Sequence, residues 1–217
     1  MVIKGKVKSG MIKFNKTNAL RASLQKSNSE LSNLGTIIFL GNASIGCGTK
    51  ILVQKGATLE LGKSVIITDF INLGCHNYIY IGDYTSIAHR SQIQESNHHF
   101  IYDVKTRTVT SCTHSISIGK GCWICNSITI TSGVTIPDHC IVASNSLVNK
   151  KEEITKAQSG SIIGGIPAKV ITSGRYRIFN SKCESFLYQW FDSHPNDSYN
   201  FSNETQLDEL INPYNII

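Results

Sequence analysis

The stretch of residues 118–148, IGKGCWICNSITITSGVTIPDHCIVASNSLV, carries a β-branched aliphatic residue at every sixth position. The members of this series are Ile118, Ile124, Ile130, Ile136, Val142 and Val148. A spacing of six fits neither the period of an amphipathic helix nor the simple alternation of a strand. It is typical of a parallel β-helix, in which three six-residue units complete one coil of a prism.

The same spacing recurs upstream and assigns a place to each side chain of the repeat. Its members are Ile81, Ile87 and Ile93, then Leu61, Ile67, Leu73 and Ile79, and a weaker series of Phe39, Ile45 and Ile51. We expect the aliphatic side chain to point into the prism and the residue four positions later to fill the corner. The small residue that often follows the aliphatic one lets the backbone turn. Because one unit cannot bury its own aliphatic residue, stability must come from stacked neighbours.

The repeat also divides the chain. Residues 1–36 show no clear period and are expected to form an irregular lead-in or cap, whereas residues 37–171 are predicted to form the β-helix. The interval between Ile93 and Ile118 is not a multiple of six. A loop at about residues 95–115 must therefore leave the prism.

The region after the coils has a different character. Residues 149–161 are polar and are expected to form a loop, and residues 162–171 a final strand. Within the C-terminal region, residues 172–217, the apolar spacing of residues 175–191 predicts a short amphipathic helix followed by a polar tail. The expected fold class is thus all-β, a parallel β-helix with an extruded loop and a short C-terminal helix.

The composition suits one main domain with appendages. The chain has 217 residues, of which 41% are hydrophobic, and a formal net charge of +6. No apolar run reaches the ~18 residues of a membrane-spanning helix, and the lysines of residues 1–14 are not followed by the apolar segment of a secretory signal. We therefore expect a cytoplasmic protein. The basic residues lack interleaved aromatics, which disfavours nucleic-acid binding, and those after the coils suit a phosphorylated small molecule.

Seven cysteines are present, most of them inside the repeat. Cys122 and Cys140 occupy the corner-filling position, where a free cysteine packs as a small apolar residue. Cys122 and Cys125 also form one CxxC motif, a spacing found in metal and redox sites. Since the six-residue register puts these two sulfurs on different faces, packing is the favoured interpretation and no metal site is expected.

The loop that interrupts the coils carries the candidate chemistry. It begins with Glu95 and contains the adjacent histidines His98 and His99. A neutral imidazole can take a proton from a hydroxyl near physiological pH, so this is a candidate general base. A solvated polar loop is the competing interpretation. Trp123 stands at an outward position where the coils resume, and so large an apolar side chain there predicts a covering subunit, a ligand, or both.

Three motifs, in order, resemble the bacterial hexapeptide-repeat O-acetyltransferases, in particular the branch acting on capsular and lipopolysaccharide sugars, which includes sialic acid O-acetyltransferases. The motifs are Asn97-x-His99-x-Ile101-Tyr102-Asp103, Gly121-Cys122-Trp123-Ile124 and Gly165-Ile166-Pro167-Ala168-Lys169-Val170-Ile171. The resemblance covers roughly residues 60–175 and implies a left-handed β-helix, a homotrimer, and acetyl-CoA bound between two prisms. The chain departs from the family at Asn97, where Asp is usual, and at Cys125, where Gly is usual.

The resemblance implies direct acetyl transfer from acetyl-CoA to a hydroxyl of a cell-surface sugar. His99 takes the place of the catalytic histidine and Trp123 that of its paired tryptophan. His99 would remove the hydroxyl proton, the alkoxide would attack the thioester carbonyl, and CoA thiolate would leave. The Trp123 N–H or a corner amide would stabilise the developing oxyanion, and Glu95 is expected to orient the imidazole.

Two further groups of residues have implied binding roles. The group expected to contact acetyl-CoA comprises Ala143 and Ser144 at the pantetheine arm, Pro167 and Ala168 at the adenine, and Lys169 and Lys150 at phosphate. The group expected to face the acceptor comprises His98, Tyr102, Lys105 and Arg107. The two cations in this second group favour an anionic sugar such as sialic acid.

Three alternative functions are left open. An N-acetyltransferase acting on an amino sugar would use the same site. A γ-type carbonic anhydrase shares the prism but needs three histidines on a metal ion, and the histidine spacing here does not fit that site. A structural or ice-binding β-solenoid would favour regular threonine ladders and no intruding loop.

Overall fold

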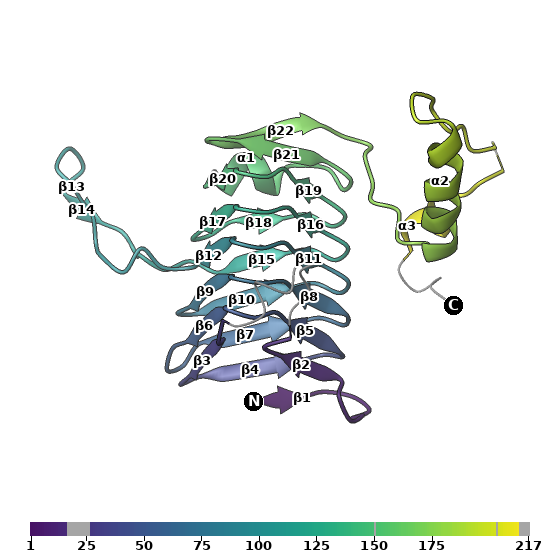
Figure 1. Ribbon diagram of the computed structural model, residues 1–217. Helices are drawn as coiled ribbons and strands as arrows, with labels where there is room; N and C mark the ends of the chain where they lie inside the picture. Colours follow the sequence, from purple (N-terminus) through teal and green to yellow (C-terminus); the bar gives the residue numbers. More distant parts are fainter. Residues whose placement is uncertain (17–26, 150, 203, 213–217) are drawn as a thin grey trace. The chain divides into compact units, whose positions relative to one another are not determined.

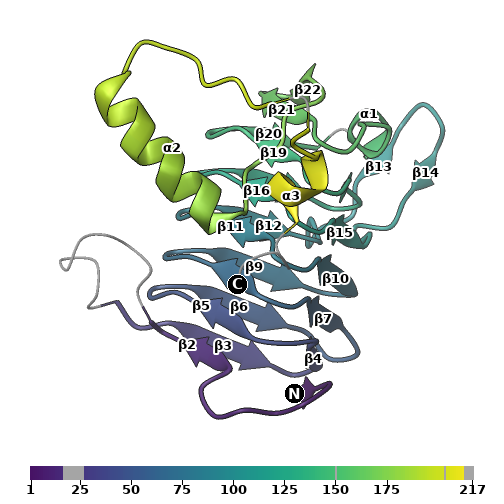
Figure 2. The same cartoon turned by 90° about the vertical axis from the view of Figure 1, so that its right-hand side faces the viewer.

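The six-residue units fold as short strands on the three faces of a prism, seen from two sides in Figures 1 and 2. The computed structural model describes residues 1–16, 27–149, 151–202 and 204–212. The coil strands pair in parallel with the strand of the next coil on the same face. The winding is that of a left-handed β-helix, as the motifs predicted. This prism is the first of two units, Met1–Arg175 and Tyr176–Ile217.

Each face of the prism is one sheet. The first face carries β1 (Val2–Ile3), β4 (Thr36–Phe39), β7 (Thr58–Leu61), β10 (Tyr78–Ile81), β15 (Ile116–Ile118) and β18 (Thr135–Ile136). The second carries β2 (Ile12–Phe14), β5 (Ala43–Ile45), β8 (Val65–Ile67), β11 (Ser86–Ile87), β16 (Trp123–Ile124), β19 (Ile141–Val142), β21 (Ile162–Gly165) and β22 (Ala168–Thr172). The third carries β3 (Glu30–Asn33), β6 (Lys50–Val53), β9 (Asn72–Cys75), β12 (Gln92–Gln94), β17 (Thr129–Thr131) and β20 (Leu147–Val148).

The inward ladders predicted from the six-residue spacing are confirmed. On the first face Ile81 pairs with Ile118 and Ile118 with Ile136. The other two faces keep this register, with the ladders Ile87–Ile124–Val142 and Ile93–Ile130–Val148. None of these side chains is more than 1% exposed. Because burying one such side chain is worth ~1.5–3 kcal/mol, the stacked ladders are the main source of the prism's stability.

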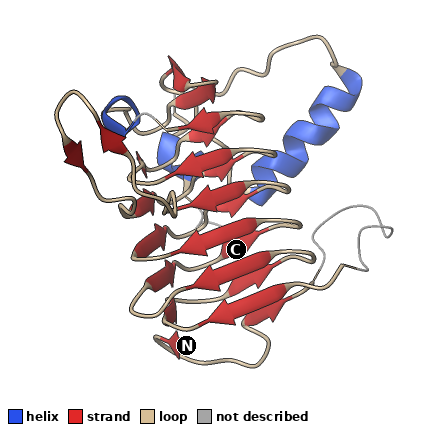
Figure 3. Cartoon of the chain, turned by 90° about the vertical axis from the view of Figure 1, so that its left-hand side faces the viewer, coloured by secondary structure: helices blue, strands red, loops and turns tan. Residues whose placement is uncertain are grey.

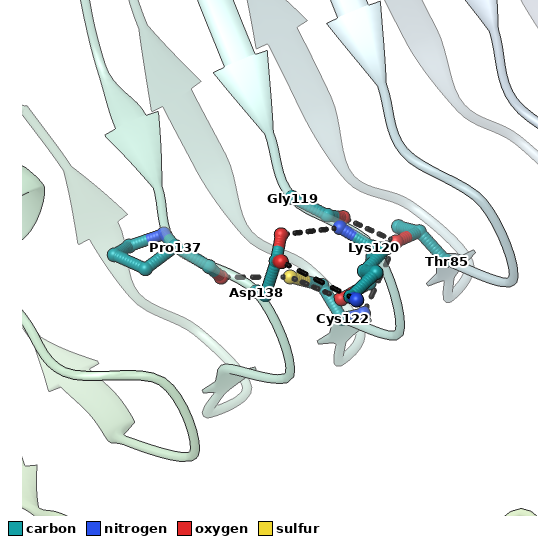
Figure 4. A network of polar contacts seen from close by, with 6 residues as sticks. All are labelled: Thr85, Gly119, Lys120, Cys122, Pro137 and Asp138. Carbon is teal, nitrogen blue, oxygen red and sulfur yellow. Dashed lines mark hydrogen bonds and ion pairs between the residues drawn. The ribbon is translucent and has the colours of Figure 1, made fainter. Parts of the chain in front are cut away.

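The corners explain the small residue after each aliphatic position. A Cβ atom at Gly119 would lie 2.5 Å from Oδ1 and 2.6 Å from N of Asp138, in the next coil. The Asp138 carboxylate uses this space to accept a hydrogen bond from Lys120 N at 2.9 Å (Figure 4). Gly62 and Asp83 repeat the arrangement at an earlier corner. A corner acid therefore satisfies a backbone N–H of the preceding coil.

The N-terminal region, expected to be an irregular lead-in or a capping coil, adds strands to the prism. The strands β1, β2 and β3 pair in parallel with β4, β5 and β6 and add a further coil. Ile3 and Ile12 pack against the core of the prism. The six-residue spacing is lost here because residues 4–11 make a longer connection than an ordinary corner.

The predicted loop leaves the prism after β12 and returns at β15. Its outer part is an antiparallel hairpin of β13 (Tyr102–Asp103) and β14 (Thr108–Val109), which projects away from the stacked coils in Figure 1. The Asp103 carboxylate closes the hairpin turn by accepting hydrogen bonds from Lys105 N at 2.8 Å and Thr106 N at 3.0 Å. These two bonds lower the pKa of Asp103.

The end of the prism also differs from the sequence prediction. A short helix, α1 (Lys151–Thr155), lies where residues 149–161 were expected to be a loop, and its Ile154 is fully buried over the last coil. The single strand predicted for residues 162–171 is two antiparallel strands, β21 and β22. They are joined by a turn that contains the cis peptide bond Ile166–Pro167. Figure 3 shows α1 at the end of the stack.

The second unit contains two helices, α2 (Ser181–Ser193) and α3 (Leu207–Ile211). The helix predicted over residues 175–191 begins later, because the Asn180 side chain accepts hydrogen bonds from Lys182 N and Cys183 N and caps the first turn. Trp190 stacks on His194 and contacts Tyr199 edge-on, so this unit has a small aromatic cluster of its own. Among the described residues, no helix is long and apolar enough to cross a membrane.

Candidate active site

Hydrogen bonds hold together the two ends of the loop where it leaves the prism. Asn97 N donates to Cys112 O at 2.9 Å, and Ser96 forms an isolated bridge with Thr113. Ser96 is only 6% exposed, and its hydroxyl oxygen accepts a hydrogen bond from His98 N at 3.0 Å. The segment that carries the two histidines is therefore bonded as firmly as a prism corner.

Glu95 occupies a prism corner and not the loop. Its side chain is fully buried, and Oε2 accepts hydrogen bonds from His76 N at 2.8 Å and Asn77 N at 2.6 Å. This is the position that Asp83 and Asp138 take at other corners. The prediction that Glu95 orients the His99 imidazole is corrected accordingly, because this carboxylate holds the backbone of the preceding coil. Its second oxygen, Oε1, is buried without a hydrogen-bond partner among the described residues.

The two adjacent histidines, His98 and His99, are both exposed at the root of the loop. His98 has a left-handed backbone, with φ of 61°, and its ring centroid is 4.6 Å from that of His76 at an interplanar angle of 85°. His99 is exposed, as a base that meets an incoming hydroxyl must be. Among the residues that the structure describes, His98 is the member of this pair whose ring contacts a ring of the prism.

His76 belongs to this site, although sequence reasoning weighed it only as a metal ligand. Burial lowers the pKa of His76, the neighbouring His98 lowers it further, and Glu95 opposes both effects. Its Nε2 atom is buried and has no hydrogen-bond partner among the described residues. His76 could have been found from the register of the repeat, because it lies one coil before Glu95, at the corner where the loop leaves the prism.

The residues predicted to face the acceptor lie on the exposed hairpin. Tyr102 is 55% exposed in β13 and pairs with Val109. Lys105 and Arg107 stand in the hairpin turn, and Arg107 has a left-handed backbone with φ of 56°. Together with His98, these side chains are placed along one continuous arm, so the loop brings the predicted acceptor residues to one side of the prism.

Trp123 faces outward on the second face, as predicted, and is 41% exposed. It lies in one outward column with Ser86 and Ile66, and Ile66 is 40% exposed. The loop that carries His99, in contrast, leaves from the corner between the third and first faces. A single chain therefore presents His99 and Trp123 on different sides of the prism.

The residues predicted to contact acetyl-CoA lie at the last coil and the closing hairpin. Ser144, Pro167 and Lys169 are exposed, and the Ser144 hydroxyl donates to Asn126 Oδ1 at 2.7 Å. Ala143 N donates to Ile163 O, so its backbone is already part of the sheet. Ala168 is fully buried in the core, which corrects the prediction that it borders the adenine. Lys150 lies outside the described residues.

The cysteines behave as packing residues. Cys122 is fully buried, and burial raises the pKa of its thiol well above the usual range. Burial likewise raises the pKa of the Cys75 thiol to about 12. Within residues 1–16, 27–149, 151–202 and 204–212, no group of three or more histidine, cysteine or acidic side chains is placed to hold a metal ion.

Comparison with known proteins identifies relatives of this prism. No protein-family model matches the chain. The putative lipopolysaccharide biosynthesis O-acetyl transferase WbbJ of Escherichia coli is 24% identical over 151 residues, which are 65% of this chain and 74% of WbbJ.

Solved structures share the architecture. The N-acyltransferase AntD of Bacillus cereus, crystallised with dTDP and coenzyme A, aligns with a TM-score of 0.57 and 15% identity over 88% of this chain and 91% of AntD. The polysialic-acid-specific acetyltransferase NeuO aligns with a TM-score of 0.49 and 19% identity over 88% of this chain and 84% of its own. The chain is thus similar in sequence to a putative lipopolysaccharide O-acetyl transferase and shares the fold of the acyltransferase AntD.

Proposed function

We propose that the protein transfers an acetyl group from acetyl-CoA to a hydroxyl of a capsular or lipopolysaccharide sugar, with His99 as the general base. The observation that carries this proposal is the root of the loop. There, Ser96 accepts a hydrogen bond from the backbone of His98, Glu95 holds the corner of the preceding coil, and His98 and His99 are exposed. The name of WbbJ, a putative lipopolysaccharide O-acetyl transferase, supports the acceptor class.

The chemistry assigned to this chain is the movement of one proton and the stabilisation of one charge. Acetyl-CoA supplies an activated thioester, so no covalent intermediate on the protein is required. His99 takes the hydroxyl proton as the oxygen attacks, and the same imidazolium then returns it to the departing thiolate. A fixed N–H donor at the developing oxyanion is typically worth ~3–4 kcal/mol. The indole N–H of Trp123 is our candidate for this donor.

The proposal requires two chains for each site. One chain presents His99 and Trp123 on different sides of its prism, so both can reach one acceptor only if Trp123 comes from a neighbour. A homotrimer of roughly parallel prisms would provide three such junctions. The exposed column formed by Ile66 and Trp123 is the surface that we expect a neighbour to cover.

Acetyl-CoA is proposed to lie along the last coils, between two prisms. The exposed Ser144, Pro167 and Lys169 fit this assignment, since a hydroxyl and an ammonium can bond the amide arm and a phosphate. Ala143 would contribute backbone groups only. The proposal includes a cytoplasmic location, where acetyl-CoA is available.

The test is an acetyl-CoA consumption assay against a panel of sugars, with N-acetylneuraminic acid as the anionic member and an amino sugar as the N-acetylation arm. His99→Ala should lower turnover by about 100-fold or more, whereas His98→Ala should cost much less. A larger loss of turnover in His98→Ala than in His99→Ala would assign the base to His98. Absence of transfer to every sugar by the wild-type protein would contradict the proposed activity itself.

Subunit exchange tests the shared site. A mixture of His99→Ala and Trp123→Ala chains, co-assembled, should regain part of the activity that each variant lacks alone, because some junctions then combine two intact partners. Light scattering that shows a stable monomer at micromolar concentration would contradict the two-chain site.

A further inference from the structure

We propose that His76 is a positioning residue for the catalytic pair: its ring sets the direction of His98 and, through the shared peptide, that of His99. This inference rests on the proposed acetyl transfer. It concerns a side chain one coil below the loop, outside the motifs that carry the similarity to acetyltransferases. Its basis is an unbroken series of contacts from a prism corner to the base.

The first contact fixes the backbone of His76. At other corners an acid also bonds a backbone N–H of the preceding coil, as Asp83 does with Lys63 N at 2.7 Å and Asp138 with Lys120 N at 2.9 Å. Glu95 accepts two, from His76 and Asn77, and is fully buried. Glutamate is one methylene longer than aspartate, which lets one oxygen reach both amides. His76 is thereby held at the corner where the loop departs.

The second contact joins the two rings. The centroids of His76 and His98 are 4.6 Å apart and the planes are nearly perpendicular. This edge-to-face arrangement is a favourable geometry for aromatic rings. Displacing the His76 ring would therefore remove the packing surface against which His98 rests.

The third contact holds His98 in a left-handed backbone conformation, which corner residues such as Tyr84 and Arg90 also adopt. A non-glycine residue in the left-handed region costs roughly 1–2 kcal/mol, and His98 is held there with φ of 61°. Its N–H bonds the buried Ser96 hydroxyl, and its ring packs on His76. Such a conformation persists only where the surroundings over-determine it. Because His99 follows directly, its direction depends on the same two contacts.

The charges around His76 favour packing over proton transfer. Burial and His98 both lower the pKa of His76, against the opposing effect of Glu95. The buried Nε2 atom has no hydrogen-bond partner among the described residues through which a proton could pass. The geometry therefore favours a role for the His76 ring through its contact with His98 and not through proton transfer.

Two substitutions separate shape from proton transfer. His76→Phe keeps a flat ring at the position and removes both nitrogens, whereas His76→Ala removes the ring. His89→Ala is the matched control, since His89 is an exposed histidine in the same coil at a different corner. Each variant is assayed as the full-length protein with acetyl-CoA and N-acetylneuraminic acid. The ring signals of His98 are followed by NMR with labelled histidine and assigned with His98→Gln.

His76→Ala should lower kcat about tenfold, no more than His98→Ala does, with KM for acetyl-CoA within about twofold, because a small misplacement of a catalytic group is costly. It should also shift the His98 ring signals. His76→Phe should recover kcat to within about threefold of wild type, and His89→Ala should leave both readouts unchanged.

Two results would overturn the inference. The first is a His76→Ala protein with wild-type kcat and unmoved His98 signals. The second is a His76→Phe protein as impaired as His76→Ala, since that would assign the role to the imidazole nitrogens. The NMR shifts do not depend on the reaction. If the wild-type protein has no transferase activity, the proposed function is therefore rejected. The NMR shifts still test the contact between the His76 and His98 rings.

Discussion

Removing the Glu95 carboxylate should loosen the corner beneath the catalytic loop, and the size of the effect follows from two hydrogen bonds. Glu95→Ala deletes the acceptor of both His76 N and Asn77 N, at 2.8 and 2.6 Å. A hydrogen bond to a charged group contributes about 1.5–3 kcal/mol. Since both amides share one oxygen, we take the lower value for each bond, about 1.5 kcal/mol, which gives about 3 kcal/mol for the pair.

This energy predicts a change that can be measured locally. Each 1.4 kcal/mol is a factor of ten in an equilibrium, so the amides of His76 and Asn77 should exchange with solvent about 100-fold faster in Glu95→Ala. Hydrogen exchange measured on peptides that cover residues 72–80 reports this opening. The kcat for acetyl transfer should fall in parallel, because the same corner carries His98 and His99.

Asp83→Ala is the matched control, as it removes a corner acid two corners earlier on the chain. It should speed exchange at Lys63, whose N–H it bonds at 2.7 Å, and leave the amides of His76 and Asn77 unchanged. Equal losses of kcat in Asp83→Ala and Glu95→Ala would refute the reasoning, since the effect would then be general destabilisation of the prism. Unchanged exchange at His76 in Glu95→Ala would refute it as well.

Three further predictions concern the acceptor, the corners and pH. Lys105→Ala with Arg107→Ala should raise KM for an anionic acceptor about tenfold and leave KM for acetyl-CoA unchanged, since these cations lie on the hairpin and not at the last coils; equal increases in both constants would contradict this division. Gly119→Ala should destabilise the fold by about 1–3 kcal/mol in urea unfolding, because its Cβ would lie 2.6 Å from the Asp138 backbone nitrogen. Adding Asp138→Ala to Gly119→Ala should not restore the lost stability. Ser117→Ala, on the outer side of the same strand, should change stability by less than about 0.5 kcal/mol. The pKa of His76 is lowered from 6.5, so as pH falls below about 6.5 the unfolded chain binds a proton that the folded chain does not. The melting temperature should therefore fall between about pH 7 and pH 5, and less so in His76→Phe; an identical fall in both proteins would exclude His76 as the cause.

The sequence by itself determined the prism, its inward residues and the place where the loop departs. A six-residue repeat puts Ile118, Ile124 and Ile130 on successive faces whatever the rest of the chain does, because each unit repeats the same local geometry and stacks on its neighbour. The same repeat identified Trp123 as outward-facing, since only its offset from Ile118 is needed.

What only the tertiary structure decided are the features that depend on contacts between coils. Glu95 and His76 are 19 positions apart in sequence, and their hydrogen bond exists only because one coil lies on the next. For the same reason, the sequence alone could not show whether the Glu95 carboxylate bonds the backbone of the preceding coil or orients His99. The helix around Ile154 and the closing hairpin of β21 and β22 cover the end of the stack, where the repeat stops and its spacing carries no information. Stacking, and not the local sequence, therefore decided how the candidate base is held.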